Sequence, residues 1–271
     1  MNATVRLRCS FDGGRLTEAF AYERPPEGET KFAIPAEAYR RAYDRCETCG
    51  HYFARHAIDL SRLYESSYVD ATYGGAAGMK ARLDKILALP PERSDNAGRA
   101  ARVDAFAGEA RGRKLLDVGA GIGVFPASML TRGWAVDAIE LDIRTAEHLR
   151  DTLRITAYTE DLKSLAGRGI GQFDAVTFNK VIEHVDDPVG ILRNAVPLLA
   201  DGGFIYVEVP DVAAAVDGPG REEFFIEHLH VFSPASFIMT IERADLAVST
   251  LQRMREPSGK FTLFAFARAV P

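Results

Sequence analysis

The sequence is poor in several features that would assign it to a specialised class of protein. It has no sustained run of Lys and Arg, and the formal net charge of its 271 residues is −5, so the basic surface that nucleic acids require is missing. The first ten residues lack an apolar core of signal-peptide length, and no window approaches an uninterrupted membrane span. We therefore expect a soluble cytoplasmic protein that binds neither nucleic acid nor membrane; a homodimer stays open.

Cysteine is scarce as well. The chain holds three cysteines, an odd number in a sequence without an export signal, which argues against a disulfide framework. Two of them stand as Cys46-Glu-Thr-Cys49, a spacing that favours metal or thiol chemistry. Internal repeats and low-complexity tracts are also missing. What remains, 47% hydrophobic residues, is enough for one large domain plus a small accessory piece.

Three regions of the chain differ in texture. An N-terminal region over residues 1–75 is rich in turns, Arg and aromatics, and a helical lead-in over 76–112 is interrupted at Pro90-Pro91. From residue 113 to 271, apolar strands alternate with helices. The strands that we expect there are Lys114–Val118, Ala135–Glu140, Ile155–Thr159, Ala175–Asn179, Gly203–Val209, Ala247–Met254 and Phe261–Arg268. The expected helices are Phe125–Arg132, Ile143–Leu153, Pro188–Leu199 and Pro234–Ala244.

This alternation predicts an α/β domain with a doubly wound, mostly parallel sheet that helices cover on both faces. The last two of the seven strands are joined by Glu256-Pro-Ser-Gly259, which leaves no room for a helix. We therefore expect an antiparallel hairpin there, with one strand reversed in the sheet.

A glycine turn follows the first of these strands, in the sequence LLDVGAGIG from Leu115 to Gly123. Its spacing is G-x-G-x-G, whereas dinucleotide-binding turns have G-x-G-x-x-G. Asp117 precedes it and would repel a pyrophosphate, but it suits a cofactor with a cationic amino-acid end. Glu140 ends the next strand, where a carboxylate can hold both ribose hydroxyls, and Asp161 follows the third strand, where it could accept from an adenine amino group.

The motifs LLDVGAGIG, AIELD, FDAVTFNKVIEHVDDP and LLADGGFIYVEVPD occur in this order over Arg113–Pro271. In them the chain resembles the class I S-adenosylmethionine-dependent methyltransferases. The resemblance implies methyl transfer from S-adenosylmethionine to a small-molecule or carrier-linked acceptor, with a hydroxyl of a sugar or secondary metabolite favoured and nitrogen or carbon open. A non-catalytic S-adenosylmethionine-binding regulatory or assembly protein is the alternative. The cofactor-binding residues implied are Asp117, Gly119, Ala120, Gly121, Glu140, Leu141, Asp161, Leu162 and Asn179.

Two histidine motifs are candidates for proton transfer. Glu183-His184 follows the fourth strand, and Glu227-His-Leu-His-Val-Phe-Ser233 follows the fifth. In an extended segment His228 and His230 would face the same side, and the H-x-H-x-F-S pattern resembles methyltransferases in which this segment borders the acceptor. A hydroxyl acceptor would use one of the histidines, His228 first, as general base. The alternatives are structural: His184 ties down its loop, and one histidine of the pair caps the helix that Ser233 and Pro234 begin while the other is buried and hydrogen-bonded.

A lid over the donor is a further possibility. The connection Asp211–Phe225 is longer than a strand-to-helix link needs and contains Gly218-Pro-Gly220. Together with the segment of Tyr64, Tyr68 and Tyr73 it could exclude water. These tyrosines could equally be packing residues.

The cysteines predict a zinc site. Cys46-x-x-Cys49-Gly has the shape of a zinc knuckle, and Cys9-Ser-Phe-Asp12-Gly13 repeats that shape with an aspartate in the second place. The pair resembles the short zinc-binding region that precedes some sugar-modifying methyltransferases, which carry four cysteines. We expect a zinc-ribbon-like N-terminal domain with a structural Zn²⁺ on Cys9, Asp12, Cys46 and Cys49; His51 is a rival fourth ligand.

Overall fold

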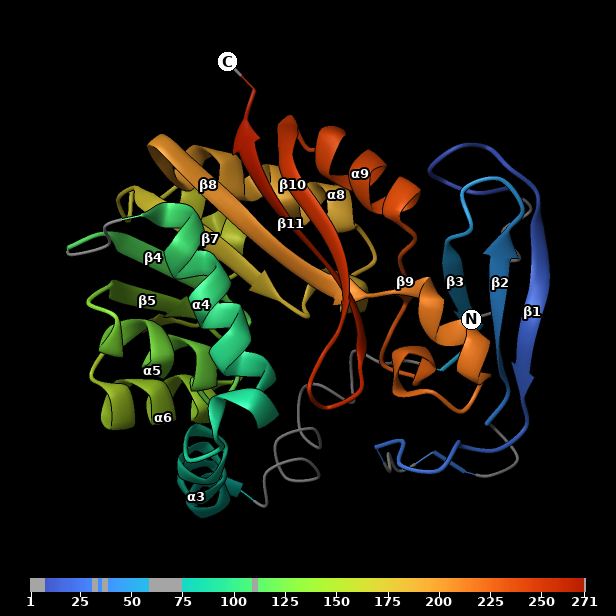
Figure 1. Ribbon diagram of the computed structural model, residues 1–271, viewed down its shortest axis with the longest axis horizontal. Helices are drawn as coiled ribbons and strands as arrows, with labels where there is room; N and C mark the ends of the chain where they lie inside the picture. The colour runs from blue at the N-terminus through green and yellow to red at the C-terminus, as the bar shows by residue number, and fades with distance from the viewer. Residues whose placement is uncertain (1–7, 31–33, 36–38, 59–74, 109–111, 271) are drawn as a thin grey trace.

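The computed structural model describes the chain except for residues 1–7, 31–33, 36–38, 59–74, 109–111 and 271. A seven-stranded sheet forms its centre, in the order β10-β11-β8-β7-β4-β5-β6 (Figure 1). All neighbouring pairs are parallel except the two that β11 makes with β10 and β8. Its strands are β4 (Lys114–Val118), β5 (Ala135–Ile139), β6 (Thr156–Tyr158), β7 (Phe173–Asn179), β8 (Leu199–Pro210), β10 (Leu246–Arg255) and β11 (Phe261–Ala269).

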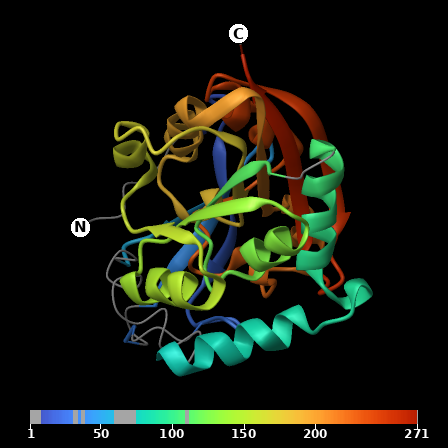
Figure 2. The ribbon, with the colours of Figure 1, turned by 90° about the vertical axis from the view of Figure 1, so that its left-hand side faces the viewer.

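Each face of this sheet carries its own core, because successive side chains of a strand point to opposite faces. Leu115 packs on one side and its neighbour Leu116 on the other. The face of Leu115 is covered by α4 (Asp95–Ala107), α5 (Val124–Thr131) and α6 (Ile143–Leu153). The opposite face is covered by α7 (Leu162–Ala166), α8 (Pro188–Ala195) and α9 (Pro234–Glu242). Figure 2 shows the sheet between these helices, with α3 (Gly75–Leu87) below it.

The expected doubly wound sheet with one reversed strand is thus confirmed. The predicted helix Ile143–Leu153 has the same bounds in the structure, and Ser233 caps α9 through the expected hydrogen bond, from Ser236 N. Strand β8 extends beyond the predicted Gly203–Val209 at both ends. Helix α7 was not expected, since five residues are too few to show a helical period.

A second, four-stranded antiparallel sheet stands beside the first one (Figure 1). Its strands are β1 (Leu16–Tyr22), β2 (Arg41–Cys46), β3 (Tyr52–His56) and β9 (His230–Val231), in that order. Although β9 belongs to the later part of the chain, it pairs with β3 through Tyr52 opposite Val231 and Phe53 opposite His230. The second sheet therefore combines the N-terminal region with a strand that follows β8.

The long connection after β8 contains two short 3-10 turns, Val212–Asp217 and Glu222–Phe224. Its Pro219 carbonyl accepts a hydrogen bond from the Tyr22 hydroxyl at 2.8 Å, so the connection packs against the second sheet. The tyrosines of the expected lid, Tyr64, Tyr68 and Tyr73, lie outside the described residues. Within the described parts of the chain, none of the helices has the length and apolarity that a membrane span needs.

Candidate active site and metal cluster

The glycine turn after β4 has a backbone that only glycine adopts easily. Gly119, Gly121 and Gly123 all have positive φ angles, of 70°, 53° and 85°. A Cβ on Gly119 would lie 2.8 Å from Val181 Cγ2, so a side chain at this position would also clash with Val181. The N–H of Gly119 donates to Ile139 O at 2.8 Å, and that of Ala120 to the same oxygen at 3.2 Å. The turn therefore lies at the carboxyl ends of β4 and β5, where open α/β sheets bind their ligands.

Asp117 lies beneath this turn and is 1% exposed. Its Oδ1 accepts hydrogen bonds from Thr177 Oγ1 and from Asn179 Nδ2, both at 2.7 Å. Burial raises the pKa of Asp117 to about 7, although these two hydrogen bonds favour the charged form. The Oδ1 of Asn179 is buried and has no hydrogen-bond partner among the described residues, so an acceptor is left at this edge for a ligand's N–H.

Glu140 connects the end of β5 with the glycine turn. Its Oε2 accepts from Gly121 N at 2.8 Å and its Oε1 from Asp142 N at 3.4 Å. Burial raises the pKa of Glu140. The next residue, Leu141, is 67% exposed, and Ile143 is 61% exposed. Two exposed apolar side chains beside a carboxylate are suited to a flat, partly apolar ligand; Ile143 was not among the residues singled out from the sequence.

Asp161 and Leu162 begin helix α7. Asp161 is exposed and caps the helix, because its carboxylate accepts from Ser164 N and from Ser164 Oγ, each at 2.9 Å. The side chain of Leu162 is buried in the core, which leaves its backbone to face a ligand. The expected adenine contact of Asp161 thus stays a prediction, with a structural role as cap already evident.

Glu183, His184 and His228 form a cluster in which one ligand-type atom from each lies within 4.8 Å of the others. The His184 and His228 rings are 4.9 Å apart. Each Nδ1 lies by a backbone carbonyl, His184 by Glu227 O at 2.8 Å and His228 by Glu223 O at 3.0 Å. A carbonyl only accepts, so both Nδ1 atoms carry the proton and each Nε2 presents its lone pair when the ring is neutral.

Burial also sets the charges in this cluster. It lowers the pKa of His184 and, more strongly, that of His228, so both imidazoles are neutral near pH 7. Glu183 is fully buried, and neither of its carboxylate oxygens has a hydrogen-bond partner among the described residues. Burial raises the pKa of Glu183 to about 8. The cluster therefore presents neutral groups that can accept or donate protons.

The expectation that His228 and His230 share one face is wrong. His228 lies in a turn closed by its N–H on Phe225 O, and the strand begins only at His230. His230 is 3% exposed, and its Nδ1 lies 3.1 Å from His51 Nε2. His228 thus meets His184, whereas His230 belongs to the interior of the second sheet.

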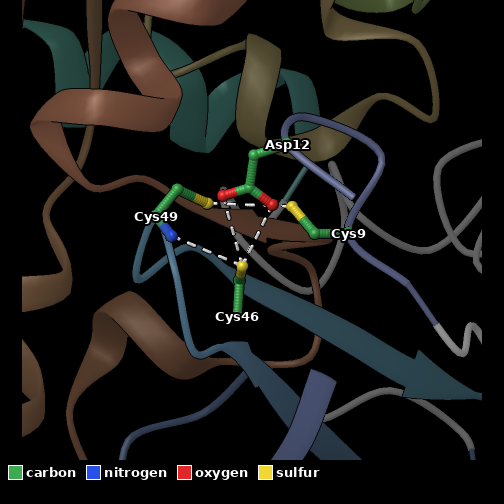
Figure 3. Close-up of side chains that lie close together, drawn as sticks. All are labelled: Cys9, Asp12, Cys46 and Cys49. Carbon is green, nitrogen blue, oxygen red and sulfur yellow. Dashed lines mark hydrogen bonds between the residues drawn. The ribbon is translucent and has the colours of Figure 1, made fainter. Parts of the chain in front are cut away.

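Cys9, Asp12, Cys46 and Cys49 come together at one end of the second sheet, with their ligand atoms within 4.8 Å of one another. In Figure 3 the three sulfur atoms and the Asp12 carboxylate point toward one another. The Sγ atoms of Cys9 and Cys49 are 3.7 Å apart, close to the ~3.8 Å that tetrahedral bonds of about 2.3 Å to a shared zinc would give. Cys46 Sγ lies 3.3 Å from Asp12 Oδ1. The residues therefore fit a tetrahedral S₃O site.

The backbone around this cluster is built for close approach. A Cβ on Gly14 would lie within 3.0 Å of Cys46 Sγ and of Asp12 Oδ1. Gly14 N donates to Asp12 Oδ1, and Cys49 N donates to Cys46 Sγ at 3.4 Å. The rival ligand His51 lies elsewhere: its Nδ1 is 2.9 Å from Ser236 Oγ. The geometry thus brings Asp12, and not His51, next to the three cysteines.

One buried network was missed from the sequence. Glu208, near the end of β8, pairs with Arg99 and Arg102 of α4. Despite the cost of burial, these arginines hold the pKa of Glu208 well below its usual range. The pairing joins residues more than a hundred positions apart. Glu208 lies within the motif LLADGGFIYVEVPD, but the two arginines lie outside every motif singled out from the sequence. A separate cavity of about 180 Å³, lined by Lys114, Ala135 and Phe173 among others, opens at the amino ends of the strands, away from every candidate residue above.

Comparisons with known proteins point to one family. A family model described as a methyltransferase domain matches residues 89–251, more than half of the chain. The ubiquinone biosynthesis O-methyltransferase of Bordetella avium is 27% identical over 201 residues, which cover 66% of this chain and 82% of that relative. The one of Psychrobacter cryohalolentis is 40% identical over 101 residues, 34% of this chain and 38% of the relative. The chain thus spans less than half the length of that relative.

Solved structures share the fold. The 1,6-didemethyltoxoflavin-N1-methyltransferase of Burkholderia thailandensis, solved with S-adenosylhomocysteine, superposes with a TM-score of 0.59 at 20% identity and covers 90% of this chain and 100% of that one. A glycopeptide N-methyltransferase in complex with S-adenosylmethionine has a TM-score of 0.53 at 18% identity and covers 64% of this chain and 93% of that one. At these identities the likeness concerns the fold alone.

Proposed function

This chain belongs to the methyltransferase-domain family, and on that basis we propose that it is an enzyme that transfers a methyl group from S-adenosylmethionine to a small-molecule or carrier-linked acceptor. The observation that carries the proposal is the glycine turn, whose positive φ angles and backbone bonds place it at the carboxyl edge together with Asp117 and Glu140. The bound cofactor supplies an electrophilic methyl group on a sulfonium.

The cofactor would lie along this edge, with each residue matched to one part of it. Glu140 would bind the ribose hydroxyls, which its two oxygens can reach while Gly121 N keeps one of them in place. Leu141, exposed beside it, would cover the adenine. Asp117 and the unpartnered Oδ1 of Asn179 would receive the cationic amino-acid end. These assignments also explain why a buried carboxyl group with a pKa of about 7, that of Asp117, lies under the turn.

The acceptor would lie against Glu183, His184 and His228. A neutral imidazole whose Nδ1–H is fixed by a carbonyl offers Nε2 as a base, and His228 meets this condition through Glu223 O. The carboxyl group of Glu183, whose oxygens have no hydrogen-bond partner among the described residues, suits a ligand that exchanges hydrogen bonds with it. These features support an uncharged hydroxyl acceptor, such as that of a sugar or secondary metabolite. Nitrogen and carbon acceptors are the alternatives. If the proton of such an acceptor is already acidic, the general base would contribute less to the rate.

We also propose that Cys9, Asp12, Cys46 and Cys49 hold a structural zinc ion. Closed structural zinc sites have four protein ligands, and the separation of the Cys9 and Cys49 sulfurs supports one. Bound zinc would fasten the loop that precedes β1 to the turn between β2 and β3. A catalytic role is disfavoured because the four ligands leave no open position.

The test of the proposed reaction is turnover. The protein would be incubated with a metabolite extract and isotopically labelled donor, and mass spectrometry would seek a labelled product together with S-adenosylhomocysteine. Binding of the cofactor without any such product would support the alternative, a non-catalytic S-adenosylmethionine-binding regulatory or assembly protein. Fragmentation of the product would identify the acceptor atom.

The ribose assignment has its own test. Because Glu140→Ala removes charged hydrogen bonds to the ribose, it should weaken binding of S-adenosylhomocysteine by ~1–3 kcal/mol in isothermal titration. Glu147→Ala, which changes an exposed acid on α6, is the matched control and should bind as the parent does. Parental affinity in Glu140→Ala would show the assignment to be wrong.

A further inference from the structure

The turn that carries His228 is held by residues of the N-terminal region, some of them on the second sheet. This stretch, residues 224–228 (the 224–228 turn), precedes β9 and contains little regular structure. Arg41 Nη1 donates to Phe224 O at 2.8 Å. Glu29 Oε1 accepts from Ile226 N at 2.8 Å. Side chains of the N-terminal region therefore take up backbone groups of the turn that a helix or a sheet would otherwise satisfy.

Tyr43 of β2 reaches the backbone of His228 itself. Its hydroxyl lies 2.5 Å from His228 O and 3.0 Å from Phe225 O, and it donates to them as a shared hydrogen bond. Tyr43 is 0% exposed, and burial keeps its pKa well above the usual range, so the hydroxyl remains a donor at every pH of interest. On the other side of His228, Leu229 N donates to Glu183 O at 2.8 Å.

The charged part of this network is buried at a cost. The side chains of Arg41 and Glu29 are each 1% exposed and pair at 2.6 Å. Arg41 also lies over the Tyr22 ring at 3.8 Å, and its Nε donates to Tyr39 at 2.6 Å. A buried ion pair is weak evidence for stability, since apolar residues of similar size often do as well. Apolar residues could not donate a hydrogen bond to Phe224 O or accept one from Ile226 N.

We propose that Tyr43, Arg41 and Glu29 are positioning residues for the reaction: they fix the backbone of the 224–228 turn and so aim the His228 imidazole at the acceptor. The inference rests on the proposed function, in which His228 is the base. It makes the second sheet a part of the active site. Carbonyls that lose their partner would let the turn move, and a displacement of about 1 Å at a reacting group can cost a hundredfold in rate.

A purely structural network would behave differently. It would lower the melting temperature when disturbed and reduce all activities of the protein in proportion to the folded fraction. A positioning network acts on the turnover number through His228 and leaves cofactor affinity alone, because the glycine turn and Glu140 lie in the other sheet.

The experiment uses Tyr43→Phe, which removes one hydroxyl and keeps the ring. Its kcat should fall roughly 10- to 100-fold, with the KM for S-adenosylmethionine unchanged. Tyr52→Phe is the matched control: it makes the same change in the neighbouring strand β3. The Tyr52 ring also packs against Phe224, but within the described parts of the chain its hydroxyl makes no hydrogen bond to the turn. This variant should keep the parental rate.

A double-mutant cycle separates positioning from general damage. If Tyr43 acts through His228, then Tyr43→Phe should cost little further rate in a His228→Ala background, because effects of residues that act as a unit are not additive. An equal loss of rate in both backgrounds, or the same loss in Tyr52→Phe as in Tyr43→Phe, would overturn the proposal.

A spectroscopic readout makes the test independent of turnover. In protein labelled with ¹⁵N-histidine, Tyr43→Phe should shift or broaden the His228 ring resonances and leave those of His148, on α6, unchanged. If Tyr43→Phe left the His228 resonances unaltered, the positioning role would be overturned, and this result does not require that the acceptor be known. Absence of turnover in the parent, with the His228 resonance shifted by Tyr43→Phe, would count against the proposed reaction and leave the structural link standing.

Discussion

Burial at single residues sets the charge of the candidate active site. Asp117, Glu183 and Glu140 all have raised pKa values, first of all because burial disfavours the carboxylate. His184 and His228 have lowered pKa values for the same reason. Such shifts lower the stability of the folded protein, and they are common at functional sites, where a bound ligand offsets this loss. For Asp117 that ligand would be the cationic end of the cofactor.

The pH dependence of stability should report the shift at Asp117. With a folded pKa of about 7 and an ordinary value of 3.8, the folded protein keeps a proton that the unfolded chain has lost. This contribution is full below about pH 4 and disappears as pH rises through 7, so from pH 5.5 to 7 it falls by about 2 kcal/mol. Asp117→Asn keeps the Oδ1 acceptor and does not ionise.

The parent should therefore lose more stability than Asp117→Asn between pH 5.5 and pH 8, as measured by urea unfolding. Asp151→Asn, which alters an exposed acid on α6, should follow the parent. Equal pH dependence in the parent and in Asp117→Asn would contradict the shifted pKa.

At the scale of elements, the two histidines of the H-x-H pattern lie in different parts of the fold. His228 lies in a turn against His184, and His230 lies in β9 against His51. The sequence pattern alone could not distinguish them, because alternation predicts a shared face only in an extended chain, and the turn at Phe225 is fixed by distant residues. The sheet edge with its glycine turn was predictable, since local hydrophobic runs determine strands and the spacing of glycines determines the turn.

The separation predicts different effects for the two alanine variants. His228→Ala should keep affinity for the cofactor and lose ~10²–10⁴-fold in turnover, the usual contribution of a general base. His230→Ala should instead lower the melting temperature, because it leaves a cavity inside the second sheet and removes the contact between His230 Nδ1 and His51 Nε2, with turnover changed little per folded molecule. Rate, affinity and melting temperature would be measured on the same preparations. Near-parental turnover in His228→Ala would leave His184 as the candidate base.

The two loops that carry the cysteines form the other informative element. Each shows the C-x-x-ligand-G shape in the sequence, so the grouping of Cys9, Asp12, Cys46 and Cys49 could be predicted down to the aspartate. The contacts of His51 could not be predicted, because its partners Ser236 and His230 come from the far end of the chain.

Metal analysis tests this element. Protein purified without added metal should contain about one equivalent of zinc, and Asp12→Ala should lose it to a chelator sooner than the parent does. Asp151→Ala serves as the control and should retain the metal. Parent protein without metal, in which three free thiols titrate, would end the zinc proposal.

At the scale of the whole molecule, the two sheets position different parts of the candidate active site. The large sheet presents the glycine turn and Glu140, and the second sheet holds the turn of His228 through Tyr43 and Arg41. Strand β9 pairs with β3 and so links them. The link escapes sequence reasoning, because a two-residue strand has no period and its partner lies more than 170 positions away. The contacts of β2 with the 224–228 turn are equally non-local.

This division predicts how zinc removal should act. Zinc would fasten the end of β2, through Cys46, and the turn that follows it, through Cys49; β2 also carries Tyr43. Chelation should therefore loosen the 224–228 turn and lower kcat roughly tenfold or more, as misplacement of a reacting group does. Affinity for S-adenosylhomocysteine should stay within about twofold, because sites that are far apart and share no partner are nearly independent. Restored zinc should restore the rate, and magnesium should not. If metal-free protein that is still folded turned over at the parental rate, the zinc would only stabilise the second sheet and would have no part in positioning His228.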